Sequence, residues 1–431
     1  MASPSLEDAR ELDAADPLAP FRDLFVLSRG TWRQAPRSTG QNEGEVIYAD
    51  GNSLGRLPKA TVARLRRVVE KEWGEALIGS WESWIDLPQR VGDLIGVEVL
   101  GSRSGETVIA DSTTVNLYKL AVASGCTTIV TDDGNFPTDR FVLQGLPGVR
   151  VERVRADPSA DDIEHALART KNSSGSDRSA LVALSHVSYF SGARLDLPGI
   201  TQAAHDAQAL VLWDLSHSAG AVPVDLAAND VDLAVGCTYK YLNGGPGSPA
   251  FLYVKTDLQD KLPPQPIQGW LGTRDPFAMQ HPAYEPAPGI GRFVSGTPPV
   301  LGLAAAEEGA AIVARAGIDA LATKAAALTS FLIDCADGHL DGLGFDVVTP
   351  RDPARRGAHV SLSHVEAWRI CRALIERLGV VPDFREPDVV RVGLAPLYSR
   401  YADAWHTVQR LRAAVVDRVY EDLPEGRRRV T

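Results

Sequence analysis

Residues 236–245 read Gly-Cys-Thr-Tyr-Lys-Tyr-Leu-Asn-Gly-Gly, and residues 213–220 read Trp-Asp-Leu-Ser-His-Ser-Ala-Gly. Each segment follows or completes a short apolar run, so Asp214 and Lys240 are expected where buried strands end. Lys240 follows Asp214 by 26 positions (240 − 214), which leaves room for a strand, a loop and a second strand. The Gly-Gly-Pro-Gly run that begins at Gly244 lacks a following Lys-Ser or Lys-Thr pair, so it predicts a tight turn rather than a P-loop.

A lysine and an aspartate in this arrangement are what an enzyme that uses pyridoxal 5'-phosphate (PLP) needs. The lysine amine can form a Schiff base with the cofactor aldehyde. The carboxylate can keep the pyridine nitrogen protonated, so that the ring accepts electrons. Several other lysines occur in polar or helical surroundings and are expected at the surface: Lys59, Lys71, Lys119, Lys171 and Lys324.

The composition is that of a globular protein with more than one domain. The chain has 431 residues, 44% hydrophobic and 23% charged, and this length favours two or three domains. A net charge of −11 argues against a nucleic-acid partner or an anionic membrane. The sequence shows neither a secretory signal nor an uninterrupted apolar stretch of membrane-spanning length. The four scattered cysteines fit reduced thiols, so we expect a cytoplasmic protein.

The pattern of apolar runs predicts an α/β architecture. Between about residues 106 and 255, six short apolar runs alternate with helical stretches, which is typical of a mostly parallel sheet with helices on both faces. An amphipathic helix is expected over 59–79 and a loop region over 255–300. A long helix from Ala304 leads to a tail with the pattern of a small α+β domain. The expected division is an N-terminal segment 1–45 that packs with the small domain, a large domain 46–310 and a small domain 311–431.

Further polar residues follow the predicted strands, and each allows more than one interpretation. The hydroxyls of Asp111–Asn116, at the start of a helix, would suit a phosphate, or they could simply form an N-cap. Phe136 and Asp139 offer an aromatic face and a second carboxylate, or a surface turn. Asp214 and His217 could be a metal pair, but no ligand set at nearby spacing completes the coordination, so no metal is expected.

With these motifs in view, the chain resembles the kynureninase family, which consists of fold type I PLP enzymes of the aminotransferase class V superfamily. The similarity extends in family order over about residues 20–400, and its most specific parts are the two segments quoted first. The segments that carry it are Tyr48–Gly55, Trp84–Pro88, Asp111–Leu117, Asn135–Asp139, Trp213–Gly220, Asp232–Pro249, Gly269–Gly272, Gly296–Leu301 and Arg391–Tyr398.

The resemblance implies a large domain with a seven-stranded, mostly parallel sheet, and it implies roles for individual residues. Lys240 would form the Schiff base, Asp214 would bind the pyridine nitrogen and Phe136 would stack on the cofactor ring, with Asp139 near its polar edge. Other residues would lie around the cofactor and its phosphate: Thr113, Thr114, Ser185, His217 and Tyr239.

The resemblance also implies a homodimer and a substrate site. Trp270 and Thr297 resemble residues that complete the pocket from the second subunit. Arg391 resembles the arginine that binds the substrate α-carboxylate, which suits its bidentate fork, and Ser53 would lie near the substrate.

The implied activity is hydrolytic Cβ–Cγ cleavage of L-kynurenine, or of a 3-hydroxy or otherwise substituted kynurenine, to an anthranilate and L-alanine. Tyr239 would relay a proton, and the setting would be tryptophan catabolism or secondary metabolism. Three positions depart from the family pattern and bear on the aromatic end of the substrate: Ser188, Phe190 and Thr273.

Two other functions are alternatives to this one. A cysteine desulfurase or β-lyase of the same fold would need a thiol on a mobile loop, whereas Cys335 and Cys371 are predicted inside buried helices. A non-catalytic PLP-binding regulator would bring a DNA-binding module or lack the catalytic residues, and the sequence indicates neither.

Overall fold

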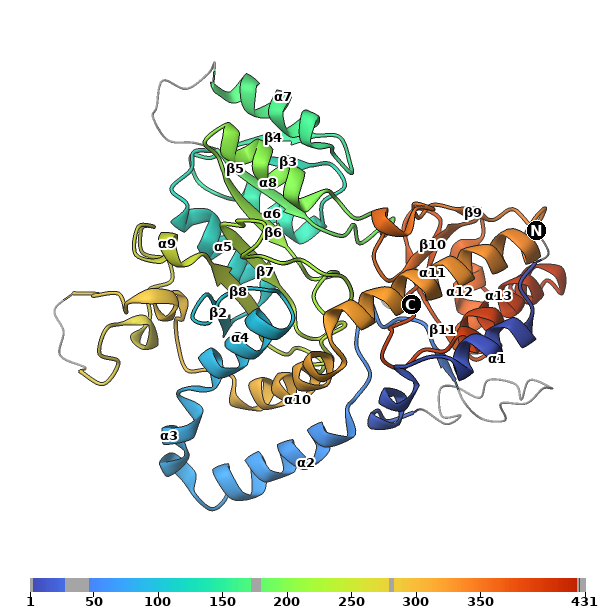
Figure 1. The fold of residues 1–431 in the computed structure, drawn as a ribbon, viewed down its shortest axis with the longest axis horizontal. Helices are drawn as coiled ribbons and strands as arrows, with labels where there is room; N and C mark the ends of the chain where they lie inside the picture. Colours follow the sequence, from blue (N-terminus) through green and yellow to red (C-terminus); the bar gives the residue numbers. More distant parts are fainter. Residues whose placement is uncertain (1–2, 28–45, 172–179, 279–282, 425, 427–431) are drawn as a thin grey trace. The chain divides into compact units, whose positions relative to one another are not determined.

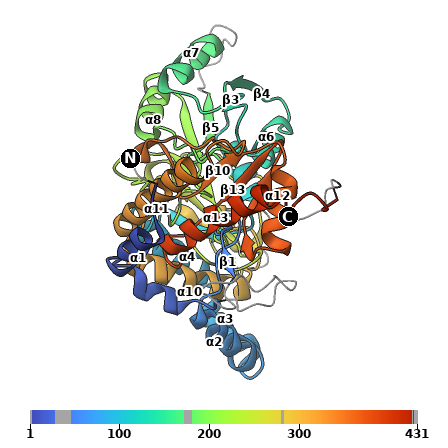
Figure 2. The ribbon, with the colours of Figure 1, turned by 90° about the vertical axis from the view of Figure 1, so that its right-hand side faces the viewer.

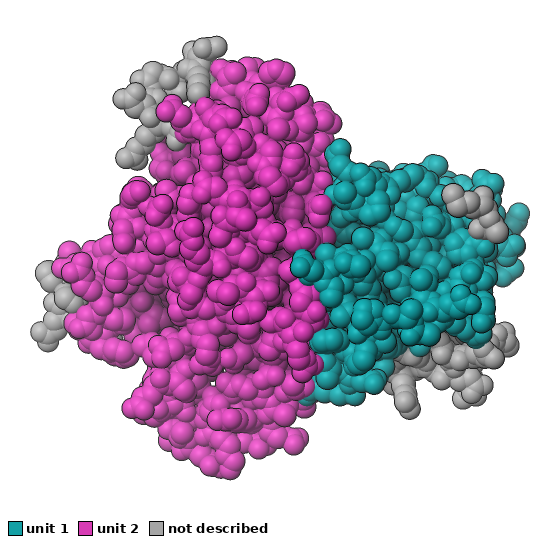
Figure 3. Space-filling view, in the orientation of Figure 1, with its two compact units in different colours: residues 1–59, 190–193, 319–431 teal, residues 60–189, 194–318 magenta. Residues whose placement is uncertain are grey.

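The computed structural model describes residues 3–27, 46–171, 180–278, 283–424 and 426, which form two compact units (Figure 3). Unit 1 contains residues 1–59, 190–193 and 319–431, and unit 2 contains residues 60–189 and 194–318. We had expected residues 46–59 in the larger domain and the end of that domain at residue 310. The structure instead groups 46–59 with the C-terminal part of the chain. Of the expected N-terminal segment, residues 28–45 lie outside the described part.

Unit 2 is built on a seven-stranded sheet in the order β2-β8-β7-β6-β5-β3-β4 (Figure 1). The neighbouring pairs from β7 to β4 are parallel, and β8 runs antiparallel to both β7 and β2. The mostly parallel α/β sheet predicted from the sequence is therefore confirmed. The strands are β2 (Thr107–Ala110), β3 (Thr128–Asp132), β4 (Arg150–Val154), β5 (Leu181–Ser185), β6 (Leu210–Asp214), β7 (Leu233–Gly236) and β8 (Ala250–Val254).

Helices cover the sheet because its central strands are apolar on both faces. Every residue of β2, β3, β7 and β8 is buried. The described part of the expected loop region over 255–300 is largely irregular, with a short helix, α9 (Thr256–Gln259), and short helical turns at η4 (Trp270–Gly272) and η5 (Gly289–Phe293). The helices are α3 (Trp81–Trp84), α4 (Leu87–Glu98), α5 (Thr113–Ala123), α6 (Pro137–Gln144), α7 (Ala160–Lys171), α8 (Leu197–Asp206), α9 (Thr256–Gln259) and α10 (Val300–Ala316).

The edge strand β4 was not among the strands identified from the sequence. Its residues read Arg-Val-Glu-Arg-Val, and only Val154 is buried. An edge strand of an otherwise buried sheet can carry charges, since one side of it faces solvent. The apolar run that marks the other strands is therefore missing here.

The helix expected over 59–79 is shorter than predicted. α2 (Lys59–Arg67) passes into a π-helical turn, η2 (Val68–Trp73), and a 3-10 turn, η3 (Leu77–Ser80), follows. The apolar side chains that we expected to face a core are mostly exposed in the single chain, Trp73 by 60%. The amphipathic pattern therefore does not correspond to burial within one copy of the protein.

Unit 1 has the α+β composition expected of the small domain. Helix α12 packs on an antiparallel sheet with the strand order β12-β13-β10-β9, and β1 (Ile47–Tyr48) pairs in parallel with β11 (Val380–Val381). Helix α1 (Leu6–Ala14) lies beside α13 (Figure 2), whose first amides donate to Asp13. The remaining elements are α11 (Ile318–His339), β9 (Asp346–Val347), β10 (Val360–Ser363), α12 (Ala367–Glu376), β12 (Asp383–Arg385), β13 (Val389–Val392) and α13 (Tyr401–Val416).

None of the described helices is long and apolar enough to cross a membrane by itself. Helices α10 and α11 satisfy the criteria of length and composition only when they are taken together as a broken pair.

Two lysines expected at the surface are buried instead. The ammonium group of Lys324 lies 2.6 Å from Asp16 Oδ2, and the two side chains are 6% and 5% exposed. Lys119 is fully buried, pairs with Asp111 and donates to the Phe293 carbonyl. Both lysines lie in helices. Asp16 is distant from Lys324 in sequence, and Asp111 precedes the helix that contains Lys119. The local sequence pattern therefore could not show that these lysines are buried in ion pairs. Lys59 and Lys71 are exposed as expected, and the side chain of Lys171 lies outside the described part.

Replacing Lys324 by methionine should lower the free energy of unfolding by about 3 kcal/mol, because Asp16 would then be a buried charge without its partner. Urea denaturation monitored by circular dichroism measures this loss. As a control, removing the exposed Lys71–Glu75 pair with Lys71→Ala should cost less than about 1 kcal/mol. The double variant Lys324→Met/Asp16→Asn should recover most of the lost stability; equal losses in the single and double variants would contradict the role of the ion pair.

Candidate active site

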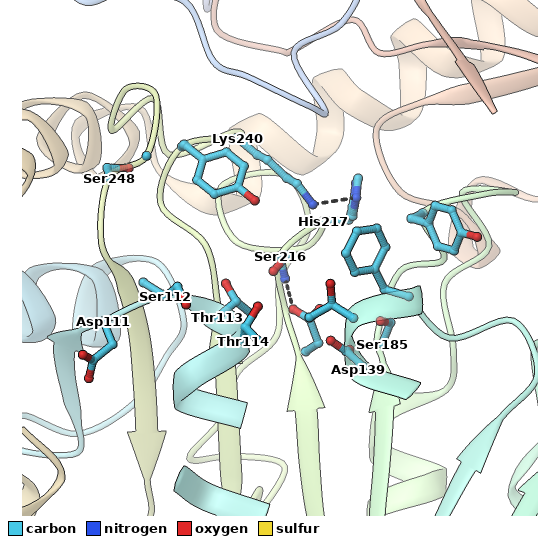
Figure 4. Close-up of a pocket in the computed structure, with 17 residues that line it drawn as sticks. Asp111, Ser112, Thr113, Thr114, Asp139, Ser185, Ser216, His217, Lys240 and Ser248 are labelled. Carbon is cyan, nitrogen blue, oxygen red and sulfur yellow. Dashed lines mark hydrogen bonds between the residues drawn. The ribbon is translucent and has the colours of Figure 1, made fainter. Parts of the chain in front are cut away.

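A cavity opens at the carboxyl ends of the strands of unit 2, where sheets of this kind bind ligands (Figure 4). The polar side chains around it come from the loops that follow β2, β3, β5, β6 and β7. Of the predicted site residues, nine line this cavity: Thr113, Thr114, Phe136, Asp139, Ser185, Asp214, His217, Tyr239 and Lys240.

Lys240 reaches the cavity from the turn after β7. The turn is closed by the Asn243 amide, which donates to the Lys240 carbonyl at 2.9 Å, and Asn243 itself has a φ of 56°. The amine of Lys240 lies 2.8 Å from Nε2 of His217 (Figure 4). It lies 5.9 Å from the centre of the Phe136 ring. The amine is therefore held in the cavity by a ring nitrogen and lies near an aromatic ring.

Asp214 and Asp139 form a pair of carboxyl groups on the floor of the cavity. Asp214 ends β6, and its Oδ1 accepts from the Ser216 amide at 2.8 Å. Burial, followed by the adjacent Asp214 charge, raises the pKa of Asp139 well above its usual value. Of the two carboxyl groups, Asp139 is therefore the one that more readily takes up a proton.

The start of α5 satisfies both interpretations of its hydroxyl-rich sequence. Ser112 is the N-cap, since its Oγ accepts from the Val115 amide at 3.3 Å. Thr113 and Thr114 are the first helical residues and line the cavity (Figure 4). The amides and hydroxyls at this helix N-terminus are suited to bind a phosphate group.

These residues fit PLP. One cavity is surrounded by an amine, a carboxylate, an aromatic ring and a helix N-terminus suited to bind an anion. Each of these groups can interact with a different part of that cofactor. Oδ2 of Asp139 is buried and has no hydrogen-bond partner among the described residues, so the polar floor of the cavity is incompletely satisfied by the protein. Nowhere in the described ranges do three or more His, Cys, Asp or Glu side chains gather as a metal site would require.

Trp270 and Thr297 do not line this cavity. Trp270 packs edge-on against Trp81 and Phe277, with ring centres 6.0 Å apart in both pairs. Thr297 is exposed and lines a second cavity of unit 2, to which Asp111 also contributes. Their expected role, to complete the pocket from a second subunit, stays a prediction.

Ser53 and Arg391 belong to unit 1, where they contact each other. Arg391 Nη2 donates to Ser53 Oγ at 3.0 Å, and Arg391 Nε donates to Asp383 Oδ1 at 2.8 Å. The sequence had suggested the first two residues but not Asp383, which lies opposite Arg391 in the pairing of β12 with β13.

The three residues that depart from the family pattern also lie outside the lining of the cavity. Thr273 donates its hydroxyl to the Trp270 carbonyl at 2.9 Å and so closes its own turn. The Phe190 carbonyl accepts from the Ser361 hydroxyl within unit 1.

Sequence reasoning missed several residues of the cavity. Tyr189 packs edge-on against Phe136 with ring centres 5.2 Å apart, and the Ser216 hydroxyl accepts from the Cys237 amide at 3.2 Å. Both follow the ends of predicted strands, which was the signal available. The cavity residues to which the sequence analysis gave no individual role are Asp111, Ser112, Thr138, Tyr189, Ser216, Gly247, Ser248 and Ala250.

The arrangement of the chain matches that of known enzymes. A cysteine desulfurase from Thermococcus onnurineus NA1 superimposes with a TM-score of 0.72 at 18% identity, over 97% of this chain and 100% of that one. A cysteine desulfurase from Escherichia coli superimposes with a TM-score of 0.68 at 19% identity, over 94% and 98%. At this identity the likeness concerns the fold alone, and it is the fold of the type I PLP enzymes.

Sequence relatives define the family more narrowly. Residues 321–411 match the family model described as the kynureninase C-terminal domain. The kynureninase of Burkholderia pseudomallei (strain K96243) is 42% identical over 419 residues, 94% of each protein, and that of Pseudomonas fluorescens is 41% identical over 424 residues, 95% of each. This chain belongs to the kynureninase family.

Proposed function

We propose that this protein is a PLP-dependent hydrolase that cleaves the Cβ–Cγ bond of L-kynurenine, or of a ring-substituted kynurenine, to an anthranilate and L-alanine. One observation carries the proposal: in a chain of the kynureninase family, Lys240 and Asp214 line the same cavity from the ends of neighbouring strands. Bound PLP would supply an aldehyde for the lysine amine and a ring that accepts electrons from bonds at the substrate Cα.

The residues of the cavity are suited to different roles in the reaction. Lys240 would hold the cofactor, and its free amine is suited to take a proton from the substrate Cα. Asp214, whose Oδ1 accepts from the Ser216 amide, can bind a protonated ring nitrogen. Phe136 offers its face to a flat ring, and Tyr189 fixes the plane of Phe136 by edge-on contact.

Tyr239 is suited to give a proton rather than to take one. The neighbouring Cys237 and burial together raise the pKa of Tyr239 above its usual value, so its hydroxyl stays protonated at neutral pH. Tyr239→Phe should lower kcat by about 10²–10⁴-fold while the absorption of the bound cofactor is unchanged. Steady-state kinetics with L-kynurenine measure this, and an unchanged kcat would exclude Tyr239 as the proton donor.

A homodimer with shared active sites is part of the proposal. Trp270 and Thr297 lie outside the cavity that they are expected to complete, and Trp73 on η2 is exposed. Mixing the inactive variants Lys240→Ala and Thr297→Ala would regenerate one complete site per mixed dimer, so activity should reappear on mixing. We further propose a cytoplasmic location, since none of the four cysteines forms a disulfide bond.

A cysteine desulfurase is the alternative, and the structure gives it little support. All four cysteines, Cys126, Cys237, Cys335 and Cys371, are buried, whereas a desulfurase needs a mobile, accessible thiol.

Purified protein loaded with PLP should release anthranilate and L-alanine from L-kynurenine, or the hydroxylated product from 3-hydroxy-L-kynurenine, in a spectrophotometric assay. Sulfide release from L-cysteine without cleavage of either kynurenine would reverse this assignment.

A further inference from the structure

Asn135 has a buried side-chain amide that joins two residues of the cavity. It lies in the turn after β3, and its exposed fraction is 2%. Its Oδ1 accepts from the Phe136 amide at 2.8 Å and from the Ser185 hydroxyl at 2.7 Å. Phe136 and Ser185 both line the cavity, whereas Asn135 does not (Figure 4). Asn135 therefore lies behind the cavity and binds two of the residues expected around the cofactor.

The nitrogen of the same amide is bound to two strands. Asn135 Nδ2 donates to Thr131 Oγ1 at 3.0 Å and to the Ala183 carbonyl at 3.4 Å. The pairing of β3 with β5 ends at Val130 and Val182, so the Asn135 side chain continues the hydrogen bonding between these strands. Both donors and both lone pairs of the amide are used. A fully satisfied amide of this kind is held in a single orientation.

These contacts go beyond those of a residue that only forms a turn. Asparagine commonly bonds to the backbone of its own loop, as Asn135 does to Phe136. Ala183 and Ser185, however, are 48 and 50 residues away in the sequence and belong to β5. The amide thus fixes the end of β5 relative to the end of β3, and it fixes the Ser185 hydroxyl relative to Phe136.

The chemistry of the partners also sets the direction of the Ser185 hydrogen bond. The Phe136 amide can only donate and the Ala183 carbonyl can only accept, so Oδ1 and Nδ2 of Asn135 cannot exchange places. Because Oδ1 can only accept, the Ser185 hydroxyl is the donor to Asn135. Toward the cavity, Ser185 then offers lone pairs, which can accept a hydrogen bond from a bound ligand.

We propose that Asn135 is a positioning residue for the cofactor, which acts on PLP through Ser185 and Phe136. The proposal rests on the proposed function, in which this cavity holds PLP. Loss of the amide frees the Ser185 hydroxyl to rotate and releases the backbone of Phe136, whose ring is expected to face the cofactor. Both changes weaken binding, because the ligand must then order groups that the wild-type protein holds in place.

The affinity for PLP tests this role without turnover. Equilibrium dialysis of the PLP-loaded protein against decreasing concentrations of PLP measures that affinity. Asn135→Ala should weaken it about tenfold, the equivalent of about one hydrogen bond. The visible circular dichroism of the bound cofactor should change as well, because it reports how the ring is held. An affinity equal to that of the wild type would overturn the proposal.

Gln259→Ala is the matched control for the loss of a buried amide. Gln259 is 4% exposed, and its Nε2 donates to the Gly105 and Val254 carbonyls at 2.8 and 2.9 Å. These three residues lie at the opposite end of the sheet, and none of them lines the cavity. Both alanine variants should lower the urea midpoint, but only Asn135→Ala should lower the affinity for PLP. A similar loss of affinity in Gln259→Ala would contradict the proposal.

A double variant separates positioning from an independent effect. Ser185→Ala alone should weaken PLP binding about threefold. In combination with Asn135→Ala the loss should stay near tenfold, because the amide and the hydroxyl act as one unit. A loss of about thirtyfold, the product of the two single effects, would mean that Asn135 does not act through Ser185.

Thr131→Val is a second variant should Asn135→Ala fold poorly. It keeps the shape of a fully buried side chain and removes one acceptor of Asn135 Nδ2. The amide is then held less firmly, and PLP binding should weaken about threefold. Unchanged binding in this variant would also contradict the proposal.

The dialysis measurement also separates this proposal from the proposed function. If the wild type binds PLP but cleaves neither kynurenine, the proposed function fails, and the affinities of the variants still decide the role of Asn135. If the wild type cleaves L-kynurenine and Asn135→Ala binds PLP as tightly as the wild type, the proposed function holds and the role of Asn135 is refuted.

Discussion

Replacing Lys240 by alanine should reduce kcat for L-kynurenine by about 10⁴-fold or more, since removal of a group that acts as both nucleophile and base removes the chemistry with it. Within the described residues, Lys240 is the one lysine that lines the cavity. The amine of Lys119 is bound to Asp111 and to the Phe293 carbonyl, so Lys119 cannot take the place of Lys240. The loss should therefore not be rescued from within the chain.

Borohydride reduction of the PLP-loaded protein would test the attachment point directly. The reduced cofactor should remain on the peptide that contains Lys240, as identified by mass spectrometry. Lys71→Ala, at an exposed lysine, should leave both the label and kcat unchanged. Label on a different lysine, or turnover by Lys240→Ala near the wild-type rate, would contradict the assignment.

The sequence predicted the residues that stand at strand ends. Asp214 and Ser185 complete apolar strands, and Lys240 follows one within a few positions, so the hydrophobic pattern alone placed them at one edge of a parallel sheet. The resemblance to a family then distinguished these residues from ordinary caps and turns. For these residues, the local hydrophobic pattern was enough to predict the position in the folded protein.

Features that depend on long-range partners could not be predicted in this way. The pairs Lys324–Asp16 and Arg391–Asp383 form only after segments distant in sequence come together. The edge strand β4 lacks the apolar run that a buried strand requires. Residues 46–59 directly precede unit 2 in the sequence, yet they belong to unit 1, where β1 pairs with β11. No local feature of the sequence indicates to which unit this segment belongs.

The two buried carboxyl groups of the cavity should respond very differently to the same substitution. Asp214→Asn removes the charged acceptor for the ring nitrogen and should reduce kcat by roughly 10³-fold, the scale seen when one preorganised electrostatic contact is lost. Asp139→Asn replaces the carboxyl group that more readily takes up a proton by a neutral amide, which can still donate to Asp214. We expect that variant to remain within about tenfold of the wild type.

Parallel measurements of kcat and of cofactor absorption in the two variants would decide the assignment. Both side chains are buried at the carboxyl ends of the sheet. Each variant replaces a carboxyl group by an amide of nearly the same size, so each serves as the steric control for the other. A larger loss in Asp139→Asn than in Asp214→Asn would mean that the proton resides on Asp214. The geometry favours the opposite order, because the Ser216 amide donates to Asp214 Oδ1, whereas Asp139 Oδ2 has no donor among the described residues, and a hydrogen-bonded carboxylate holds its charge more easily than an unsolvated one.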